Sequence, residues 1–327
     1  MASMTYAAAM VDVIAASMRS DQSMGLIGSA YLFGPAGDHP VLNEIREQYA
    51  NRIIDEPPIS ESAIAAVAIG SAMAGVRVLA HFGFSSFALE AWSQLVHEAG
   101  VAHHQSGGQI TVPAVFTMNH GMSPKENSQH NRSPYAMLAN CPGIEIVLPS
   151  TPADMKGLLT SALASENPTV VVNHLSLMTI EGEVPDEEHS IPFGQADIKR
   201  EGEDVTIVAT SYAVHIALQA SEELMRSGVH AEVIDPRTIV PLDRDCIRRS
   251  VAKTGRLVVV DESPITCGFG AEVAALIAET APGDLKAPVV RVSPPDIPIP
   301  RGTIAQTPFR ITPEKVVSAV TTTMSAQ

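Results

Sequence analysis

Apolar positions along the first half of the chain alternate between helical and strand patterns. Segment 87–100 predicts a helix, because Leu89, Trp92, Leu95 and Val96 recur with the period of one helical face. Helices are also predicted at 5–18, at 133–140 and, started by Pro152, at 152–165. Between them, segments 76–82, 111–118, 143–150 and 168–174 are nearly continuous apolar, β-branched runs. Such runs are typical of strands in a parallel sheet that helices cover on both faces.

The pattern changes between residues 178 and 203. This stretch is acidic, contains Gly and Pro, and has no buried period, so we expect a linker with a short hairpin there. The alternation then resumes, with strands expected at 204–210, 230–236, 256–263 and 287–293 and helices at 214–228 and 270–281. The predicted fold class is α/β, with two domains that each have a mostly parallel sheet covered by helices. The expected bounds are 1–180 and 203–327, joined by a linker at 181–202.

Composition narrows the class of protein. The 327 residues suffice for two domains with real cores, and 45% apolar against 17% charged residues excludes a disordered chain. A formal charge of −15 argues against nucleic acid or an anionic membrane surface as partner. No run of about 18 uncharged apolar residues occurs, so no membrane span is expected. The three widely spaced cysteines suit a reducing compartment, which predicts a cytoplasmic protein.

Common motifs of catalysis are missing from the chain. It has no G-x-x-x-x-G-K-[ST] phosphate loop and no H-E-x-x-H or C-x-x-C pair, so no metal site is predicted within it. The stretch 83–87 is not a G-x-S-x-G nucleophile elbow. The partial glycine motif at 268–273 is interpreted as a tight turn into a helix.

An ordered set of other features remains. A single carboxylate, Glu61, precedes a helix of small residues at 62–75. Further features follow along the chain: HFGFSSF at 81–87, SGGQ at 106–109, SQHNR at 128–132, NCPG at 140–143, DPRTIVPLD at 235–243, VDES and CGFGAEV within 260–273, and VSPPDIPIP at 292–300. In this order and spacing they resemble the beta subunit of the thiamine-diphosphate-dependent decarboxylating component of 2-oxo acid dehydrogenase complexes. The two domains of that family are similar to the pyrimidine-binding and C-terminal domains of transketolases.

The resemblance implies roles for individual residues. Glu61 falls where the family's acid reaches N1′ of the cofactor's aminopyrimidine and favours its imino form, and Phe87 falls where an aromatic ring stacks on that heterocycle. His130 falls on a histidine thought to serve acyl transfer to a lipoyl arm. Arg132 and His81 are candidate substrate contacts. The plainer alternatives are a helix-capping Glu61, a core Phe87, a surface or core His130 and a solvated Arg132.

The same resemblance implies cofactors and partners. The chain lacks the G-D-G and downstream Asn with which thiamine enzymes hold Mg²⁺ and diphosphate. Thiamine diphosphate and Mg²⁺ would therefore be held partly or mainly by an alpha subunit, in an alpha2beta2 heterotetramer that acts on a small 2-oxo acid. Ser29 and His81 stand where relatives carry acids, which weakens an assignment to pyruvate and the expectation of a lipoyl acyltransferase partner.

Two other functions stay open at this point. One is a two-component transketolase-like carboligase that passes its product to a small acceptor. The other is a non-catalytic assembly subunit, against which the joint presence of Glu61, Phe87 and His130 argues.

Overall fold

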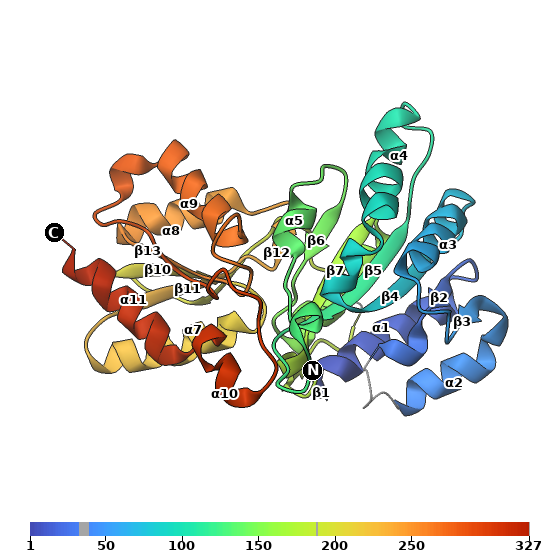
Figure 1. Cartoon of the computed structure of the whole chain (residues 1–327), viewed down its shortest axis with the longest axis horizontal. Helices are drawn as coiled ribbons and strands as arrows, with labels where there is room; N and C mark the ends of the chain where they lie inside the picture. The colour runs from blue at the N-terminus through green and yellow to red at the C-terminus, as the bar shows by residue number, and fades with distance from the viewer. Residues whose placement is uncertain (33–38, 188, 327) are drawn as a thin grey trace. The chain divides into compact units, whose positions relative to one another are not determined.

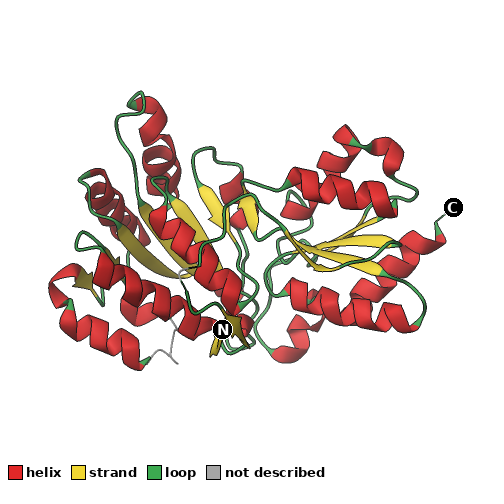
Figure 2. Ribbon diagram, turned by 180° about the vertical axis from the view of Figure 1, so that it is seen from behind, coloured by secondary structure: helices red, strands yellow, loops and turns green. Residues whose placement is uncertain are grey.

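The computed structural model describes residues 1–32, 39–187 and 189–326 (Figure 1). The chain forms two compact units, each with helices around a central sheet (Figure 2). Unit 1 contains Met1–His120 and Leu138–Phe193, and unit 2 contains Gly121–Met137 and Gly194–Gln327. The segment that carries His130 therefore belongs to the second unit, although it follows a strand of the first.

The sheet of unit 1 is parallel, as its buried apolar runs predict. In the order β6-β7-β5-β4-β2-β3 its strands are Glu145–Val147, Thr169–His174, Ala114–His120, Val78–Phe84, Gly25–Ile27 and Ile53–Ile54. Every residue of the central strands β5 and β7 is buried. Because the strands run in one direction, their carboxyl ends lie at one edge of the sheet, where open α/β sheets place their ligands.

Three of the main helices of unit 1 are preceded by a residue whose side chain caps them. The main helices are α1 (Tyr6–Ser20), α2 (Pro40–Gln48), α3 (Glu61–Met73), α4 (Gly100–Gln105) and α6 (Pro152–Ala164). The side chains of Thr5, Ser60 and Thr151 accept hydrogen bonds from the first turns of α1, α3 and α6. Helix α1 packs against α6, and α3 packs against β4.

The predicted continuous helix at 87–100 is wrong in detail. A 3₁₀ turn at Ser85–Leu89 is followed by a π-helix at Gln94–Ala99, which runs directly into α4. The wider π turn still buries Leu95 and Ala99. At the junction a Cβ on Gly143 would lie 1.8 Å from the carbonyl oxygen of Gly100, so the chain at Gly143 passes too close for any side chain.

The predicted hairpin between 178 and 203 is also wrong. Strand β8 (Glu181–Val184) pairs antiparallel with β1 (Ala2–Thr5), which is the first strand of unit 1 in the sequence. Strand β9 (Asp197–Arg200) pairs antiparallel with β11 (Ala231–Asp235) in unit 2. The two strands of the stretch thus complete different units instead of pairing with each other.

Unit 2 has its own sheet in the order β14-β13-β10-β11-β9. Apart from β9 its strands are parallel: Val290–Val292, Leu257–Val260, Val205–Ala209 and Ala231–Asp235. Helices α7 (Ala213–Arg226) and α11 (Pro313–Ser325) pack together over one face, and α8 (Arg244–Thr254) and α9 (Phe269–Thr280) lie over the other (Figure 1). None of the helices in the described ranges has both the length and the apolar composition to cross a membrane.

Candidate active site

Glu61 is the first residue of α3 and is half-buried. The cap of this helix is the preceding residue, since the hydroxyl of Ser60 accepts a hydrogen bond from the backbone N–H of Ala63 at 3.4 Å. Capping therefore does not require the carboxylate of Glu61. A carboxylate at this position also lies in the favourable field of the helix N-terminus.

Phe87 lies in the 3₁₀ turn directly after the carboxyl end of β4. Its ring meets that of Phe84 edge to face, with centroids 5.8 Å apart, and Gly83 at φ +75° approaches the same ring. The side chain is half-buried, so part of the ring is accessible. The turn is joined to α3, because the hydroxyl of Ser62 donates to the carbonyl oxygen of Glu90 at 2.5 Å. The structure thus connects the segments that carry Glu61 and Phe87.

Ser29, at the position where the family resemblance led us to expect an acid, donates a hydrogen bond to the carboxylate of Asp55. The same carboxylate forms an ion pair with Nε of Arg46 at 2.8 Å, and this Nε also donates a hydrogen bond to the hydroxyl of Ser29 at 3.3 Å. Asp55 directly follows β3, so an acid is present beside Ser29 although it comes from 26 residues further along the chain. The sequence did not reveal the contact between Asp55 and Arg46, because Arg46 lies on α2, outside any of the motifs.

His81 is fully buried in β4, and its Nδ1 lies 2.9 Å from the hydroxyl of Thr117 on β5. The backbone beside it is equally crowded, since a Cβ on Gly28 would lie 2.8 Å from the carbonyl oxygen of His81. The contact between His81 and Thr117 joins two neighbouring strands of the sheet. A substrate role for His81 stays a prediction.

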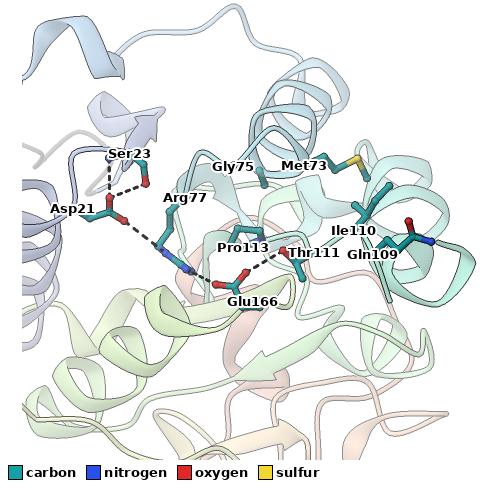
Figure 3. Close-up of a pocket in the computed structure, with 11 residues that line it drawn as sticks. Asp21, Ser23, Met73, Gly75, Arg77, Gln109, Ile110, Thr111, Pro113 and Glu166 are labelled. Carbon is teal, nitrogen blue, oxygen red and sulfur yellow. Dashed lines mark hydrogen bonds and ion pairs between the residues drawn. The ribbon is translucent and has the colours of Figure 1, made fainter. Parts of the chain in front are cut away.

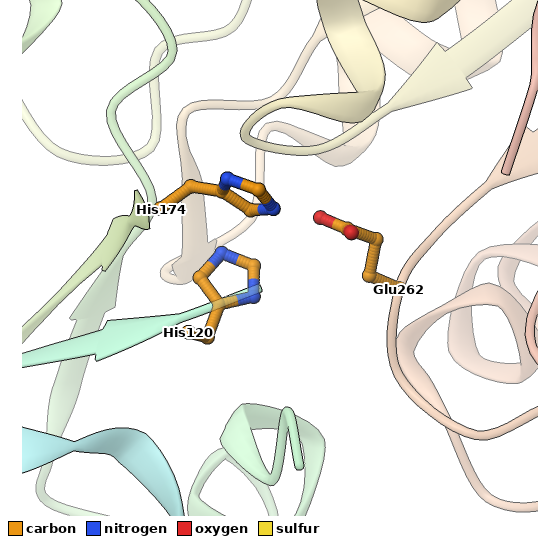
Figure 4. Close-up of side chains that lie close together, drawn as sticks. All are labelled: His120, His174 and Glu262. Carbon is orange, nitrogen blue, oxygen red and sulfur yellow. The ribbon is translucent and has the colours of Figure 1, made fainter. Parts of the chain in front are cut away.

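Two histidines that the sequence analysis did not single out lie at the carboxyl ends of β5 and β7. His120 and His174 are paired in register, and their buried rings meet edge to face with centroids 4.7 Å apart (Figure 4). Nδ1 of His174 accepts a hydrogen bond from the backbone N–H of Ser176 at 2.9 Å. The available signal was the repeated Asn-His, which directly follows the strand predicted at 111–118 and ends the strand predicted at 168–174.

His130 and Arg132 lie in the unit 2 segment Gly121–Met137. His130 ends a short 3₁₀ turn, and its Nδ1 lies 2.6 Å from Oε2 of Glu126. Arg132 is exposed. Between them Asn131 is buried, and its side chain makes several hydrogen bonds to the backbone of the same loop.

The carboxyl-terminal side of this loop is tied to the core of unit 2. The hydroxyl of Tyr135 donates to the carboxylate of Asp261, which also accepts from Ser263 and, at 3.2 Å, from Thr210. Burial raises the pKa of the Asp261 carboxyl, and burial together with the charge of Asp261 raises the pKa of Tyr135 well above its usual range. On the other side, the amide of Gln306 donates to the carbonyl oxygen of Ser123 at 2.9 Å.

A cavity of about 250 Å³ opens at the amino ends of the strands of unit 1 (Figure 3). In it Arg77 donates to Glu166 at 2.7 Å, and Thr111 donates to the same carboxylate at 3.0 Å. These hydrogen bonds lower the pKa of Glu166, with that from Arg77 the larger. Because Glu61 and Phe87 follow the carboxyl ends of β3 and β4, this cavity belongs to the opposite edge of the sheet.

Two family models match the chain and meet near the end of unit 1, although residues 121–137, which belong to unit 2 in the structure, lie within the first match. The model of the transketolase pyrimidine-binding domain matches residues 2–179, and that of the transketolase C-terminal domain matches residues 194–316. A 2-oxoisovalerate dehydrogenase subunit beta from Bacillus subtilis is 39% identical over 276 residues, 84% of each chain. An acetoin:2,6-dichlorophenolindophenol oxidoreductase subunit beta from Cupriavidus necator is 37% identical over 88% of each chain. A pyruvate dehydrogenase E1 component subunit beta from Bacillus subtilis is 35% identical over 92% of each chain.

The chain therefore belongs to the transketolase-like beta subunits of thiamine-diphosphate-dependent 2-oxo acid dehydrogenases. A solved structure described as a split gene transketolase, an inactive beta4 tetramer, has the same fold over 99% of both chains, with a TM-score of 0.81 at 21% identity. The predicted family, enzyme class and α/β fold are confirmed. Membership in this family carries the use of thiamine diphosphate and pairing with an alpha subunit.

The described residues fit one end of that cofactor. An aminopyrimidine needs an acceptor for a ring-nitrogen proton and an apolar face to stack on, and a half-buried carboxylate and an accessible phenyl ring on linked segments offer both. The other end, a diphosphate with its metal ion, needs cationic or metal-binding groups for which the sequence has no motif.

Proposed function

We propose that this chain supplies the half of a 2-oxo acid dehydrogenase active site that holds and activates the aminopyrimidine of thiamine diphosphate. The observation that supports this most is the placement of Glu61. It starts α3 without being its cap, and the bond from Ser62 to Glu90 links its turn to that of Phe87. Glu61 is the group we assign to proton exchange at the pyrimidine, and Phe87 the group that orients the ring.

Each residue has a definite task in this proposal. When bound, thiamine diphosphate supplies an electron sink for the carbon that loses carbon dioxide. Glu61 holds a proton at the N1′ nitrogen and so sets the tautomer of the pyrimidine. Phe87 packs against the face of the same ring and fixes its angle. Arg132, exposed beside His130, would meet the carboxylate of the 2-oxo acid.

Mg²⁺ and the diphosphate are assigned to the alpha subunit of an alpha2beta2 heterotetramer. The sequence of this chain has no Gly-Asp-Gly with a downstream Asn, and it carries a strong net negative charge. A diphosphate binds where cations or backbone N–H groups face it, so a partner with those groups would complete the site.

His130 is assigned to acyl transfer onto a lipoyl group of an acyltransferase partner. In that transfer a carbon–sulfur bond would form between the acyl group and one sulfur of the lipoyl disulfide, with the electron pair left by decarboxylation, and the bond of the acyl group to the cofactor would break. The sulfur–sulfur bond breaks, and the second sulfur leaves as a thiolate that needs a proton. A histidine can provide that proton near neutral pH. The three free cysteines support a reducing compartment, and we propose the cytoplasm.

Reconstitution with a cognate alpha chain tests the proposal. The two chains together, with thiamine diphosphate and Mg²⁺, should decarboxylate one or more of pyruvate, 2-oxoisovalerate and related 2-oxo acids with an artificial electron acceptor. His130→Ala should spare this reaction and reduce acyl transfer to a lipoylated carrier. Equal losses in both assays would show that His130 acts on the 2-oxo acid itself. Carboligation to a small aldehyde without acyl transfer would overturn the lipoyl assignment.

A further inference from the structure

Glu126 and His130 form a close pair in the unit 2 loop. Oε2 of Glu126 lies 2.6 Å from Nδ1 of His130, a length typical of a hydrogen bond that involves charge. About a third of the Glu126 side chain and a quarter of the His130 side chain are exposed. An ion pair of two fully exposed side chains would be weak, but this pair is partly withdrawn from water.

The backbone of the loop holds the two side chains at this separation. The backbone N–H of Glu126 donates to the carbonyl oxygen of Ser123 at 3.2 Å, and that of His130 donates to Asn127 at 3.0 Å. The buried amide of Asn131 donates to the carbonyl oxygens of Ser123, Glu126 and Asn127 at 3.0–3.3 Å and accepts from the N–H of Ser123 at 2.8 Å. Both members of the pair therefore sit on a segment whose shape is set by a side chain from the same loop.

We infer that Glu126 is a positioning residue that fixes the tautomer and ring orientation of His130. An ionised carboxylate can only accept hydrogen bonds, so Nδ1 of His130 must carry the hydrogen. The lone pair of the neutral ring then resides on Nε2, and Nε2 becomes the atom that takes up and releases a proton. Without the carboxylate, neutral histidine in water favours the other form, with its hydrogen on Nε2.

This inference rests on the function proposed for His130. Nε2 would supply the proton to the departing sulfur in acyl transfer. In the other tautomer Nδ1 is the atom that takes up and releases a proton, and it lies at a different place on the ring. The orienting carboxylate would also stabilise the imidazolium that gives up this proton, as carboxylates beside catalytic histidines do.

Nitrogen NMR of the full-length chain labelled with ¹⁵N-histidine reads the tautomer directly. The His130 signals are identified by their absence in His130→Asn. In the wild type His130 should be the Nδ1–H form, and in Glu126→Ala it should shift to the Nε2–H form. Glu126→Asp, whose shorter carboxylate keeps an acceptor nearby, should retain part of the wild-type population. Lys125→Gln changes a neighbouring exposed charge and should leave the tautomer unchanged. An unchanged tautomer in Glu126→Ala would overturn the inference.

Kinetics of the reconstituted complex provide the second measurement. Glu126→Ala should lower acyl transfer to a lipoylated carrier by about tenfold or more, a fraction of the 10²–10⁴ that a positioned acid–base group supplies. Decarboxylation with an artificial acceptor should stay within about twofold, which a general loss of folding would not permit. A tautomer change without loss of acyl transfer would overturn the role assigned to Glu126. If the wild type itself transfers no acyl group, the proposed function of His130 fails, and the NMR result still decides whether Glu126 sets the ring.

Discussion

Glu61 is the residue on which the catalytic assignment depends most. Replacement by Gln keeps the size of the side chain but removes the ionisable carboxyl group that can give up and take back a proton. Activation of the cofactor should then fall by about 10²–10⁴, while cofactor binding falls much less. The measurement is the rate at which the cofactor's C2 proton exchanges in the reconstituted complex, followed by quenched-flow NMR.

Ser60→Ala is the matched control for this experiment. It removes the cap of the same helix, and we expect it to cost about 1 kcal/mol of stability without changing the exchange rate. Exchange at the wild-type rate in Glu61→Gln would show that Glu61 only stabilises the start of α3.

Single residues differ in how far the sequence could reveal them. Glu61 and His130 could be proposed because each stands in an ordered set of motifs that resembles the family, and their roles stay predictions. Glu126 was missed, because a spacing of four residues in a polar loop without a helical pattern does not predict contact. His120 and His174 were missed because pairing of two strands distant in sequence brings their rings together.

We predict that the exposed face of α3 packs closely against another subunit. Ala63, Ala66 and Gly70 are exposed on this helix together with Val67 and Met73, and a Cβ built on Gly70 meets no atom within 4 Å. Gly70→Leu should therefore leave the fold of the chain intact and still disrupt the heterotetramer, because an interface at backbone distance cannot accept the larger side chain. Light scattering of the reconstituted complex measures this.

Two further variants separate assembly from folding. Gly70→Ala should raise the helix stability of the unassembled chain, by up to about 1 kcal/mol. Ala278→Leu introduces the same bulk at an exposed position of α9 and should not change the assembled mass. A Gly70→Leu complex of unchanged mass would exclude α3 from the interface.

Arg77, directly before β4, contacts Asp21 at the end of α1 and Ser165 and Glu166 after α6. These contacts predict that the stability of the chain depends on pH. The pKa of Glu166 is lowered in the folded chain by its hydrogen bond from Arg77. The folded state thus binds fewer protons than the unfolded state, so this stabilisation is present above the ordinary carboxyl pKa of about 4 and is lost as pH falls through the lowered value.

Arg77→Gln tests this in urea unfolding. Glu166 is largely exposed, so its share should be below about 1 kcal/mol at pH 7, and the difference between wild type and variant should shrink between about pH 5 and pH 3. Arg248→Gln breaks an exposed pair with Asp245 and should have little effect at either pH. A difference that is constant with pH would mean that Arg77 acts through its bond to the carbonyl oxygen of Ser165 alone.

Among helices and strands, the sequence predicted those whose bounds follow from a local pattern of apolar residues. Most of the predicted helices and strands appear within a few residues of their predicted bounds, since burial on one face or both imposes a period. Helices α2, α8 and α11 and the short strands β2 and β3 were not predicted. The π-helix at Gln94–Ala99 was not predicted, because its apolar spacing resembles that of an α-helix, and the close approach of Gly143 to Gly100 at its end joins segments distant in sequence. Strand β1 is only four residues long, and its partner lies far along the chain.

For the whole molecule, we predict that the chain alone binds thiamine diphosphate poorly. It offers groups for the pyrimidine but no motif for the diphosphate, which carries most of the charge to be recognised. Titration calorimetry should detect no Mg²⁺-dependent binding at micromolar concentration until the alpha chain is added. Micromolar binding to the isolated chain would contradict the division of the site between two subunits.

The pairing of β1 with β8 has a consequence for how the protein is made. Thr5 pairs with Glu181, so the partner of the first strand is among the last parts of unit 1 to leave the ribosome. At ~5–20 residues per second, β1 waits roughly 10 to 35 s for it. During that interval β1 presents unsatisfied backbone groups to other nascent chains and to chaperones. Faster synthesis of residues 6–180, by a change in codon usage alone, would shorten this exposure without altering a single contact of the finished fold.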